Sequence, residues 1–210
     1  MLENRIIDHI VYAVPDLEQA MQDFENKTGV APAFGGYHSH QGTKNAIVNI
    51  GQDAYLEIIT VDLANEAITG PRWMGVDLIQ EPKVTRWSLK SDQLSSDSAI
   101  LQAYDAQMGE VKGGQRNTSS GALLSWMMIM PLPHPEVEIV PFITSWGADS
   151  IHPTSNLQED CSLLGIQFTH PQPEVFREVW QGLGLEEPIG LGAAAQIKLV
   201  LDTPKGRVEL

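Results

Sequence analysis

The chain has 210 residues, of which 42% are hydrophobic and 19% are charged, as expected for a globular protein large enough to bury a core. Its formal net charge of -14 argues against binding to nucleic acids or anionic membranes, because those partners require clustered lysines and arginines. The sequence has one cysteine, no long uninterrupted apolar segment and no signal-peptide pattern at its start, which favours a cytoplasmic protein.

The first 64 residues predict a βαβββ unit. Residues 6–14 are apolar and rich in β-branched side chains, which is typical of a strand. Asp16 is placed to cap a helix whose apolar face runs from Leu17 to Phe24, and Gly29 is placed to end it. Three more strands are expected at residues 33–38, 45–50 and 54–61.

The same order recurs twice, in units expected at residues 82–147 and 160–210. The second unit is predicted to contain a strand at 84–90, a helix between Ile100 and Met108, and strands at 110–113, 122–130 and 137–144. The third is expected to be shortened: strand 163–168, a helix up to Leu183, and strands 195–201 and 207–210, with a fourth strand either missing or hidden in 188–191. Residues 62–82 and 148–160 are the predicted linkers.

Three segments carry a family resemblance: "DHIVYAVPDLEQA" (8–20), "GTKNAIVNIGQDAYLEII" (42–59) and "VPFITSWGADSIHP" (140–153). With the repeated units, they resemble the vicinal oxygen chelate superfamily of glyoxalases, extradiol dioxygenases and bleomycin-resistance proteins, and within it the glyoxalase-like domain branch. The resemblance implies an α+β fold in which tandem βαβββ units form curved mixed sheets around a cavity.

His9 and Glu57 are lone polar residues in apolar strands, and burying either one unpaired is costly. The resemblance implies that they converge in the cavity, where they would share a divalent metal (Zn, Mn, Fe or Ni) or bond to each other directly. Further ligands would come from the matching positions of the other units. Those positions hold Thr85, Pro141, Gly165 and Glu209, and of these only Glu209 suits a metal.

Other candidate binding residues are polar or aromatic. His38 lies in a glycine-rich stretch and is a candidate ligand contact or simply a surface histidine. His152 is a candidate third polar group or a turn residue. Asn45 is a candidate to orient a polar group or simply a turn residue, and Tyr55 alternates with Glu57 along its strand. Trp126 and Trp146 would form aromatic walls of the cavity or belong to the core.

Three functions are compatible with this pattern. The first is a metal-assisted lyase, isomerase or dioxygenase acting on a small oxygenated molecule, with Glu57 or Glu209 as base. The second is a metal-free protein that binds or sequesters a small molecule, as resistance proteins do, and the third is a degenerate structural unit. The expected partner is a small-molecule ligand, and a homodimer is a candidate assembly. Whether the protein is an enzyme stays open at this point.

Overall fold

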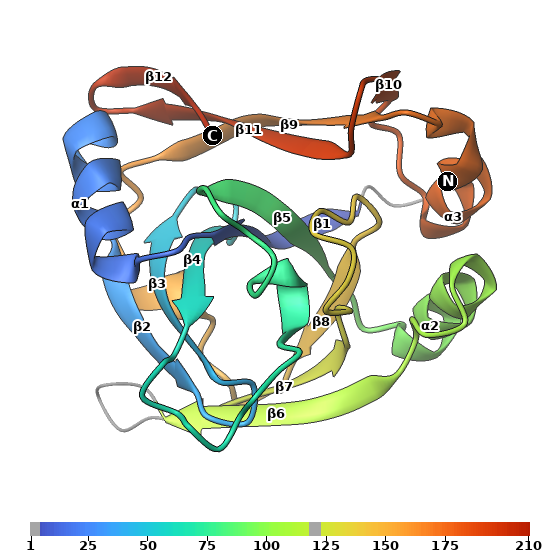
Figure 1. The fold of residues 1–210 in the computed structure, drawn as a ribbon, viewed down its shortest axis with the longest axis horizontal. Coiled ribbons are helices and arrows are strands. Elements are labelled where there is room, and N and C mark those ends of the chain that lie inside the picture. The colour runs from blue at the N-terminus through green and yellow to red at the C-terminus, as the bar shows by residue number, and fades with distance from the viewer. Residues whose placement is uncertain (1–4, 118–122) are drawn as a thin grey trace.

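The computed structural model describes residues 5–117 and 123–210, which form two sheets and three α-helices (Figure 1). The larger sheet has eight strands in the order β2-β3-β4-β1-β5-β8-β7-β6 and curls around a hollow. The smaller sheet has the order β10-β9-β11-β12 and lies across the outside of the curl. This architecture confirms the predicted α+β fold with curved mixed sheets around a cavity.

The first βαβββ run comprises β1 (Ile6–Ala13), α1 (Leu17–Thr28), β2 (Ala33–His38), β3 (Thr43–Asn49) and β4 (Tyr55–Val61). The predicted helix limits are confirmed. The Asp16 side chain accepts a hydrogen bond from the backbone N–H of Gln19, and Gly29 ends the helix with a φ of 83°.

The second run comprises β5 (Lys83–Lys90), α2 (Leu94–Tyr104), β6 (Val111–Asn117), β7 (Leu123–Ile129) and β8 (Phe142–Trp146). The prediction of a strand from residue 137 is wrong for residues 137–141. Ile139 and Val140 are buried in a loop, and the Trp87 indole donates to the Ile139 carbonyl oxygen at 2.7 Å. Ile139 and Val140 are therefore apolar because the loop is buried next to β5, and not because they belong to a strand. Of the strand predicted at 122–130, Ala122 lies outside the described residues.

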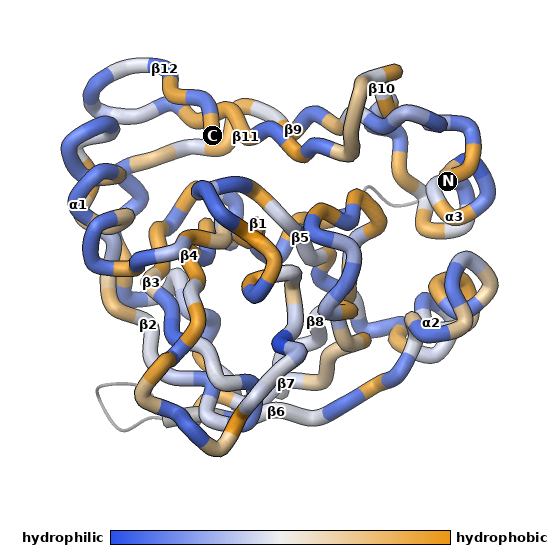
Figure 2. Tube along the Cα trace, viewed as in Figure 1, coloured by the Kyte–Doolittle hydropathy of each residue, from blue (hydrophilic) through white to orange (hydrophobic). Residues whose placement is uncertain are grey.

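The third run comprises β9 (Ser162–His170), the 3₁₀ turn η3 (Pro173–Phe176), α3 (Arg177–Leu183), β10 (Ile189–Leu191), β11 (Gln196–Thr203) and β12 (Gly206–Glu209). The strand suspected in residues 188–191 is therefore present as β10. Hydrophobic and hydrophilic residues alternate along much of β11 (Figure 2), as expected for a sheet with one buried face. On that face Phe168 packs against Trp87 of β5, with ring centres 5.0 Å apart.

The predicted linker at residues 62–82 lies partly inside the curl. Its 3₁₀ turn η1 (Trp73–Gly75) buries Trp73 and Met74 against Val11, Ile59 and Phe142. The linker therefore fills one part of the hollow and leaves the rest as a cavity. A second 3₁₀ turn, η2 (Pro153–Asn156), lies in the other predicted linker.

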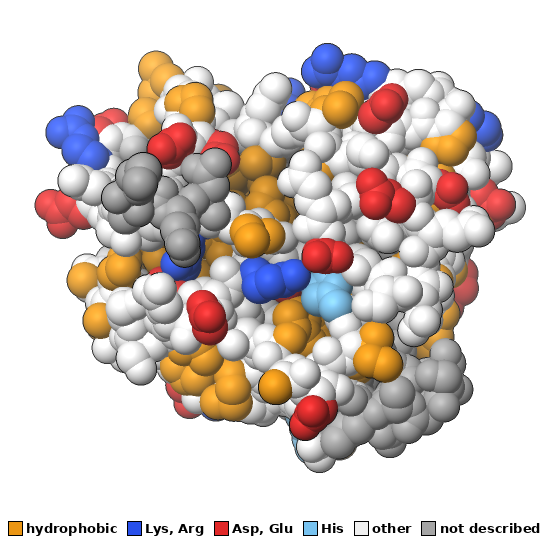
Figure 3. Space-filling model, turned by 180° about the vertical axis from the view of Figure 1, so that it is seen from behind, with side chains coloured by type: hydrophobic (Ala, Val, Ile, Leu, Met, Phe, Trp, Pro, Cys, Tyr) orange, Lys and Arg blue, Asp and Glu red, His pale blue; other side chains and the backbone are white. Residues whose placement is uncertain are grey.

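Acidic side chains are scattered over the rear face of the molecule and do not gather in one patch (Figure 3). Among the helices in residues 5–117 and 123–210, none is long and apolar enough to cross a membrane.

Candidate functional site

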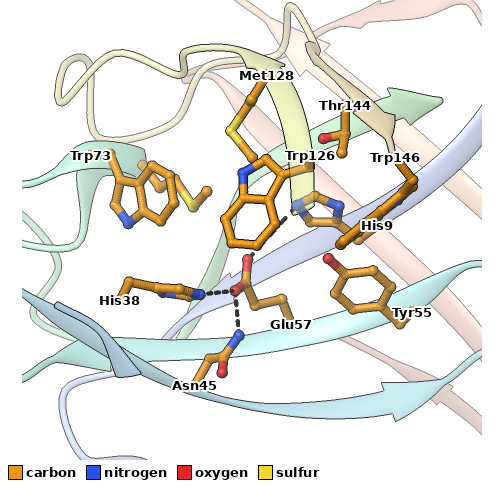
Figure 4. Close-up of a pocket in the computed structure, with 11 residues that line it drawn as sticks. His9, His38, Asn45, Tyr55, Glu57, Trp73, Trp126, Met128, Thr144 and Trp146 are labelled. Carbon is orange, nitrogen blue, oxygen red and sulfur yellow. Dashed lines mark hydrogen bonds and ion pairs between the residues drawn. The ribbon is translucent and has the colours of Figure 1, made fainter. Parts of the chain in front are cut away.

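A small cavity of about 30 Å³ lies in the hollow of the large sheet (Figure 4). Seven of the nine predicted site residues line it, and Trp73, Met74, Met128 and Thr144 complete the lining. The seven are His9, His38, Asn45, Tyr55, Glu57, Trp126 and Trp146. The fold thus brings most of the candidate residues to one place.

A larger outer cavity of about 730 Å³ adjoins the small one. Its walls include β2, with Phe34 and Tyr37, and β6, with Lys112 and Gln115. Because β2 and β6 are the two ends of the eight-stranded order, this cavity lies where the curled sheet stays open. The two cavities share three lining residues, which are His38, Trp73 and Trp126. These three therefore form the neck between them.

Glu57 lies between two histidines. Its Oε2 is 3.8 Å from His9 Nε2, and its Oε1 is 3.8 Å from His38 Nε2 (Figure 4). Both distances are too long for hydrogen bonds. The Asn45 amide donates to Glu57 Oε1 at 2.6 Å, and the Glu57 side chain is only 4% exposed. The parallel pairing of β1 with β4 puts His9 beside Tyr55, two residues before Glu57, which brings the two side chains together.

Asp8 is a site residue that the sequence did not reveal. The β1–β5 ladder pairs Ile7 with Leu89 and His9 with Ser88, so Asp8 is an extra residue in a β-bulge. A bulge lets neighbouring side chains point to the same side of a strand, and Asp8 Oδ1 bonds His9 Nδ1 at 2.6 Å. Two adjacent polar residues inside an apolar strand were the signal that could have predicted it.

The buried Asp8 carboxylate also holds the wall of the cavity. Its Oδ2 accepts a hydrogen bond from the Trp146 indole at 2.7 Å and lies 3.5 Å from His152 Nε2. Burial acts to raise the pKa of Asp8, but hydrogen bonds from His152 and His9 outweigh it, and this pKa lies well below its usual range. A carboxylate can only accept, so His9 carries a proton on Nδ1.

What Nε2 of His9 offers to Glu57 Oε2, 3.8 Å away, depends on whether it also carries a proton. With a proton on Nδ1 alone, Nε2 is an acceptor that faces a second acceptor, and the gap between the two atoms suits a donor group. With protons on both nitrogens, Nε2 points a donor at the carboxylate.

On the other side of Glu57, Thr43 orients His38. The Thr43 hydroxyl bonds His38 Nδ1 at 3.0 Å and accepts from the Trp73 indole at 3.2 Å. When this hydroxyl donates to Nδ1, His38 presents an N–H at Nε2 toward Glu57. Trp73 lies in a predicted linker, and nothing in the local sequence pattern pointed to it.

The rings around His9 fix its orientation. Tyr55 stacks on it with ring centres 4.7 Å apart and an angle of 14°, and Phe142 approaches edge-on at 5.1 Å. His152 does not line the small cavity. Its ring centre lies 5.7 Å from that of Tyr55, and its side chain also caps η2.

Glu209 is not brought to the cavity. It lies on β12 in the smaller sheet, where its side chain is exposed and lies 3.6 Å from Arg207. Among the predicted bases, only Glu57 lines the cavity.

The side chains near His9 do not complete a metal centre. Ser88 of β5 and Thr144 of β8 bond each other at 2.8 Å, and both are hydroxyls, which are weak ligands. In residues 5–117 and 123–210, no group of three or more His, Cys, Asp and Glu side chains is arranged to hold a metal ion. The two-residue set of His9 and Glu57 stays a prediction.

Comparisons with known proteins agree with the fold. A family model described as a glyoxalase-like domain matches residues 7–184. A crystal structure of a hypothetical protein from Staphylococcus aureus has a TM-score of 0.67 at 18% identity, covering 91% of this chain and 88% of that one. At this identity the likeness shows the fold alone.

A methylmalonyl-CoA epimerase in complex with methylmalonyl-CoA and NH4+ has a TM-score of 0.42 at 17% identity, over 70% of this chain and 97% of that one. The Mycobacterium tuberculosis methylmalonyl-CoA epimerase scores 0.39 at 17% identity, over 70% and 91% of the two chains. Scores this low carry no argument about this chain. No curated protein matches it in sequence.

Proposed function

Because the chain belongs to the glyoxalase-like domain family, we propose that it is an enzyme that removes a proton from a small oxygen-bearing molecule with the Glu57 carboxylate. The observation that carries this proposal is the position of Glu57, which is buried at the inner end of a cavity between two imidazole nitrogens at 3.8 Å. The Asn45 amide holds Oε1 of this carboxylate, so the proposal assigns the proton transfer to Oε2.

The proposed step is a proton abstraction next to a carbonyl group. The C–H bond of the substrate breaks, its proton moves to Glu57 Oε2, and the electron pair forms an enolate. In this proposal His38 donates from Nε2–H to the enolate oxygen, in the tautomer that accepts from Thr43 at Nδ1, while the hydrogen bond from Asn45 holds the carboxylate. Return of the proton at another position or face gives an isomerase, while loss of a neighbouring group gives a lyase.

The test follows the proton directly. Phenylpyruvate and related carbonyl compounds are incubated with the protein in D2O, and loss of the C–H signal is followed by NMR. We expect the wild-type protein to exchange the substrate's C–H hydrogen faster than a control without protein does. The exchange rate with Glu57→Gln is expected to be lower than the wild-type rate by about a hundred-fold or more. Glu209→Gln, which changes the other predicted base, is the matched control. Its rate of substrate hydrogen exchange is expected to equal that of the wild type. Equal rates for Glu57→Gln and the wild type would refute the role of Glu57.

A second candidate function is binding without chemistry. The aromatic side chains that line both cavities favour it, because such walls bind flat apolar molecules with or without turnover. Saturable binding of a compound that shows no exchange above the background rate would support this second function over the first.

A further inference from the structure

The five tryptophans of the chain are anchored in different ways. Four indole N–H groups donate hydrogen bonds within the protein: Trp73 to Thr43, Trp87 to Ile139, Trp146 to Asp8 and Trp180 to Glu187, at 3.2, 2.7, 2.7 and 2.8 Å. The Trp126 indole has no hydrogen-bond acceptor in the part of the chain that the structure describes. The Trp126 side chain is half-buried, so its ring is held by packing, including contact with the Trp146 ring, and not by a hydrogen bond to the described residues.

Trp126 lines both cavities, and Figure 4 shows it among the residues that line the inner one. The inner cavity, at about 30 Å³, has room for about one or two water molecules. The outer cavity, at about 730 Å³, is large enough for a small organic molecule. A substrate in the outer cavity therefore reaches Glu57 only when a side chain of the neck moves.

Of the three neck residues, Trp126 is the one whose ring is held by packing alone among the described residues, with its ring centre 5.8 Å from that of Trp146. His38 and Trp73 are both tied to the Thr43 hydroxyl. The Trp126 indole lies instead over Gly114, its partner on β6, where a Cβ atom would be 2.4 Å from the ring. The missing side chain at Gly114 provides the place in which the indole rests.

We propose that Trp126 is a gate between the two cavities, which a molecule with a flat aromatic ring and a narrow oxygen-bearing head displaces and then stacks against. The head passes the neck toward Glu57, while the flat body lies between the fixed Trp73 ring and the movable Trp126 ring. The free indole N–H supplies a donor to an acceptor on the ligand. This substrate class rests on the proposed function, because it takes Glu57 as the end point of the head.

The gate is tested first without ligand, in protein labelled with 5-fluorotryptophan. The five ¹⁹F signals are assigned by single Trp→Phe variants. We expect exchange broadening on the microsecond-to-millisecond timescale for Trp126 and sharp signals for the four anchored tryptophans. Gly114→Ala is expected to shift the Trp126 signal, whereas Gly113→Ala, whose Cβ would meet Met127 at 3.3 Å, is expected to leave it in place. A Trp126 signal as sharp as the others would overturn the gate.

The substrate class is tested with three probes. Phenylpyruvate carries both the ring and the carbonyl head, pyruvate lacks the ring, and 3-phenylpropanoate lacks the carbonyl. We expect phenylpyruvate to bind about ten-fold more tightly than either of the others, and Trp126→Ala to remove the advantage over pyruvate. An unchanged ratio in Trp126→Ala, or equal affinities in the wild type, would overturn the proposed class.

The same measurements on Glu57→Gln separate this inference from the proposed function. In one outcome, Trp126 is mobile and ligands with a ring still bind more tightly in this variant, but the wild type does not exchange the substrate's C–H hydrogen. This outcome would support the gate and refute the proton transfer. Exchange that depends on Glu57, combined with a static Trp126, would refute the gate and support the proton transfer.

Discussion

Asp8 and His9 are neighbours on one strand, and yet their side chains bond each other, with 2.6 Å between Asp8 Oδ1 and His9 Nδ1. Successive side chains of a regular strand point to opposite faces, so this contact depends on the bulge in β1. The bulge therefore holds the His9 ring with Nδ1 bonded to Asp8 and with Nε2 toward Glu57.

Replacing Asp8 with Asn is expected to destabilise the protein by about 2 kcal/mol at pH 7, because buried hydrogen bonds to a charged group are lost. The folded-state pKa of Asp8 is lowered, so its stabilisation is complete above the unfolded-state pKa of about 3.9 and is lost as the pH falls further. Urea denaturation at pH 7 and pH 3 measures both effects, and the difference between wild type and variant is expected to shrink at pH 3.

Asp97→Asn is the matched control for this prediction. Asp97 is also buried, but it pairs with Arg5 at 2.9 Å, and it is not among the residues that line the small cavity. The control is expected to lose stability without slowing hydrogen exchange of the substrate, whereas Asp8→Asn is expected to affect both. Equal exchange rates in the two variants would contradict the role of Asp8 in holding His9.

Metal analysis tests whether His9 and Glu57 hold an ion. The protein is produced in medium supplemented with Zn, Mn, Fe and Ni and is purified without a histidine tag. We expect no stoichiometric metal, because among the described residues no three His, Cys, Asp or Glu side chains are arranged to hold an ion, and the Ser88 and Thr144 hydroxyls are weak ligands. One equivalent of metal that is lost in His9→Ala and Glu57→Ala would show that these two residues do hold an ion.

Arg86 is expected to be essential for the loop that precedes β8. It is 1% exposed, and its guanidinium donates to the backbone oxygens of Leu132 and Glu136. Burial lowers the pKa of Arg86 to about 10, so the group stays charged at neutral pH. Arg86→Met leaves several buried carbonyls without a donor and is expected to cost about 3 kcal/mol or more. Exposed Arg177→Met is the control, expected within about 0.5 kcal/mol of the wild type in urea denaturation.

The smaller sheet is expected to contribute to the core of the whole molecule. Phe168 is 2% exposed and packs on Trp87 and Trp180, so Phe168→Ala is expected to cost about 3–5 kcal/mol. One cooperative unfolding transition, shifted as a whole, is the expected result in thermal denaturation. A separate early transition confined to the variant's third run would contradict this coupling.

Cys161 is expected to react slowly with thiol reagents at pH 8. It is 1% exposed, and burial raises the pKa of its thiol to about 11, so the reactive thiolate is scarce. The rate of reaction with Ellman's reagent is expected to rise to that of a free thiol only when the protein is unfolded in urea. Fast reaction in the folded state would contradict the burial of this residue.

The periodic parts of the sequence were predictable, and the parts fixed by long-range contacts were not. The helix caps at Asp16 and Gly29 follow from local chemistry and are confirmed. The burial of residues 137–141 depends on β5, and the burial of Trp73 depends on a linker that turns into the hollow. The position of Asp8 depends on a bulge, whose location is set by the pairing of β1 with β5.

The cavity draws on both of the first two runs, which are joined by the antiparallel β1–β5 pair within a single chain. The first run supplies His9, His38 and Glu57, while the second supplies Trp126 and Trp146. Two halves encoded in one gene are free to diverge, whereas the halves of a symmetric dimer must carry the same residues. In this chain the histidines and the glutamate that line the cavity all come from the first run, while two of its tryptophans come from the second.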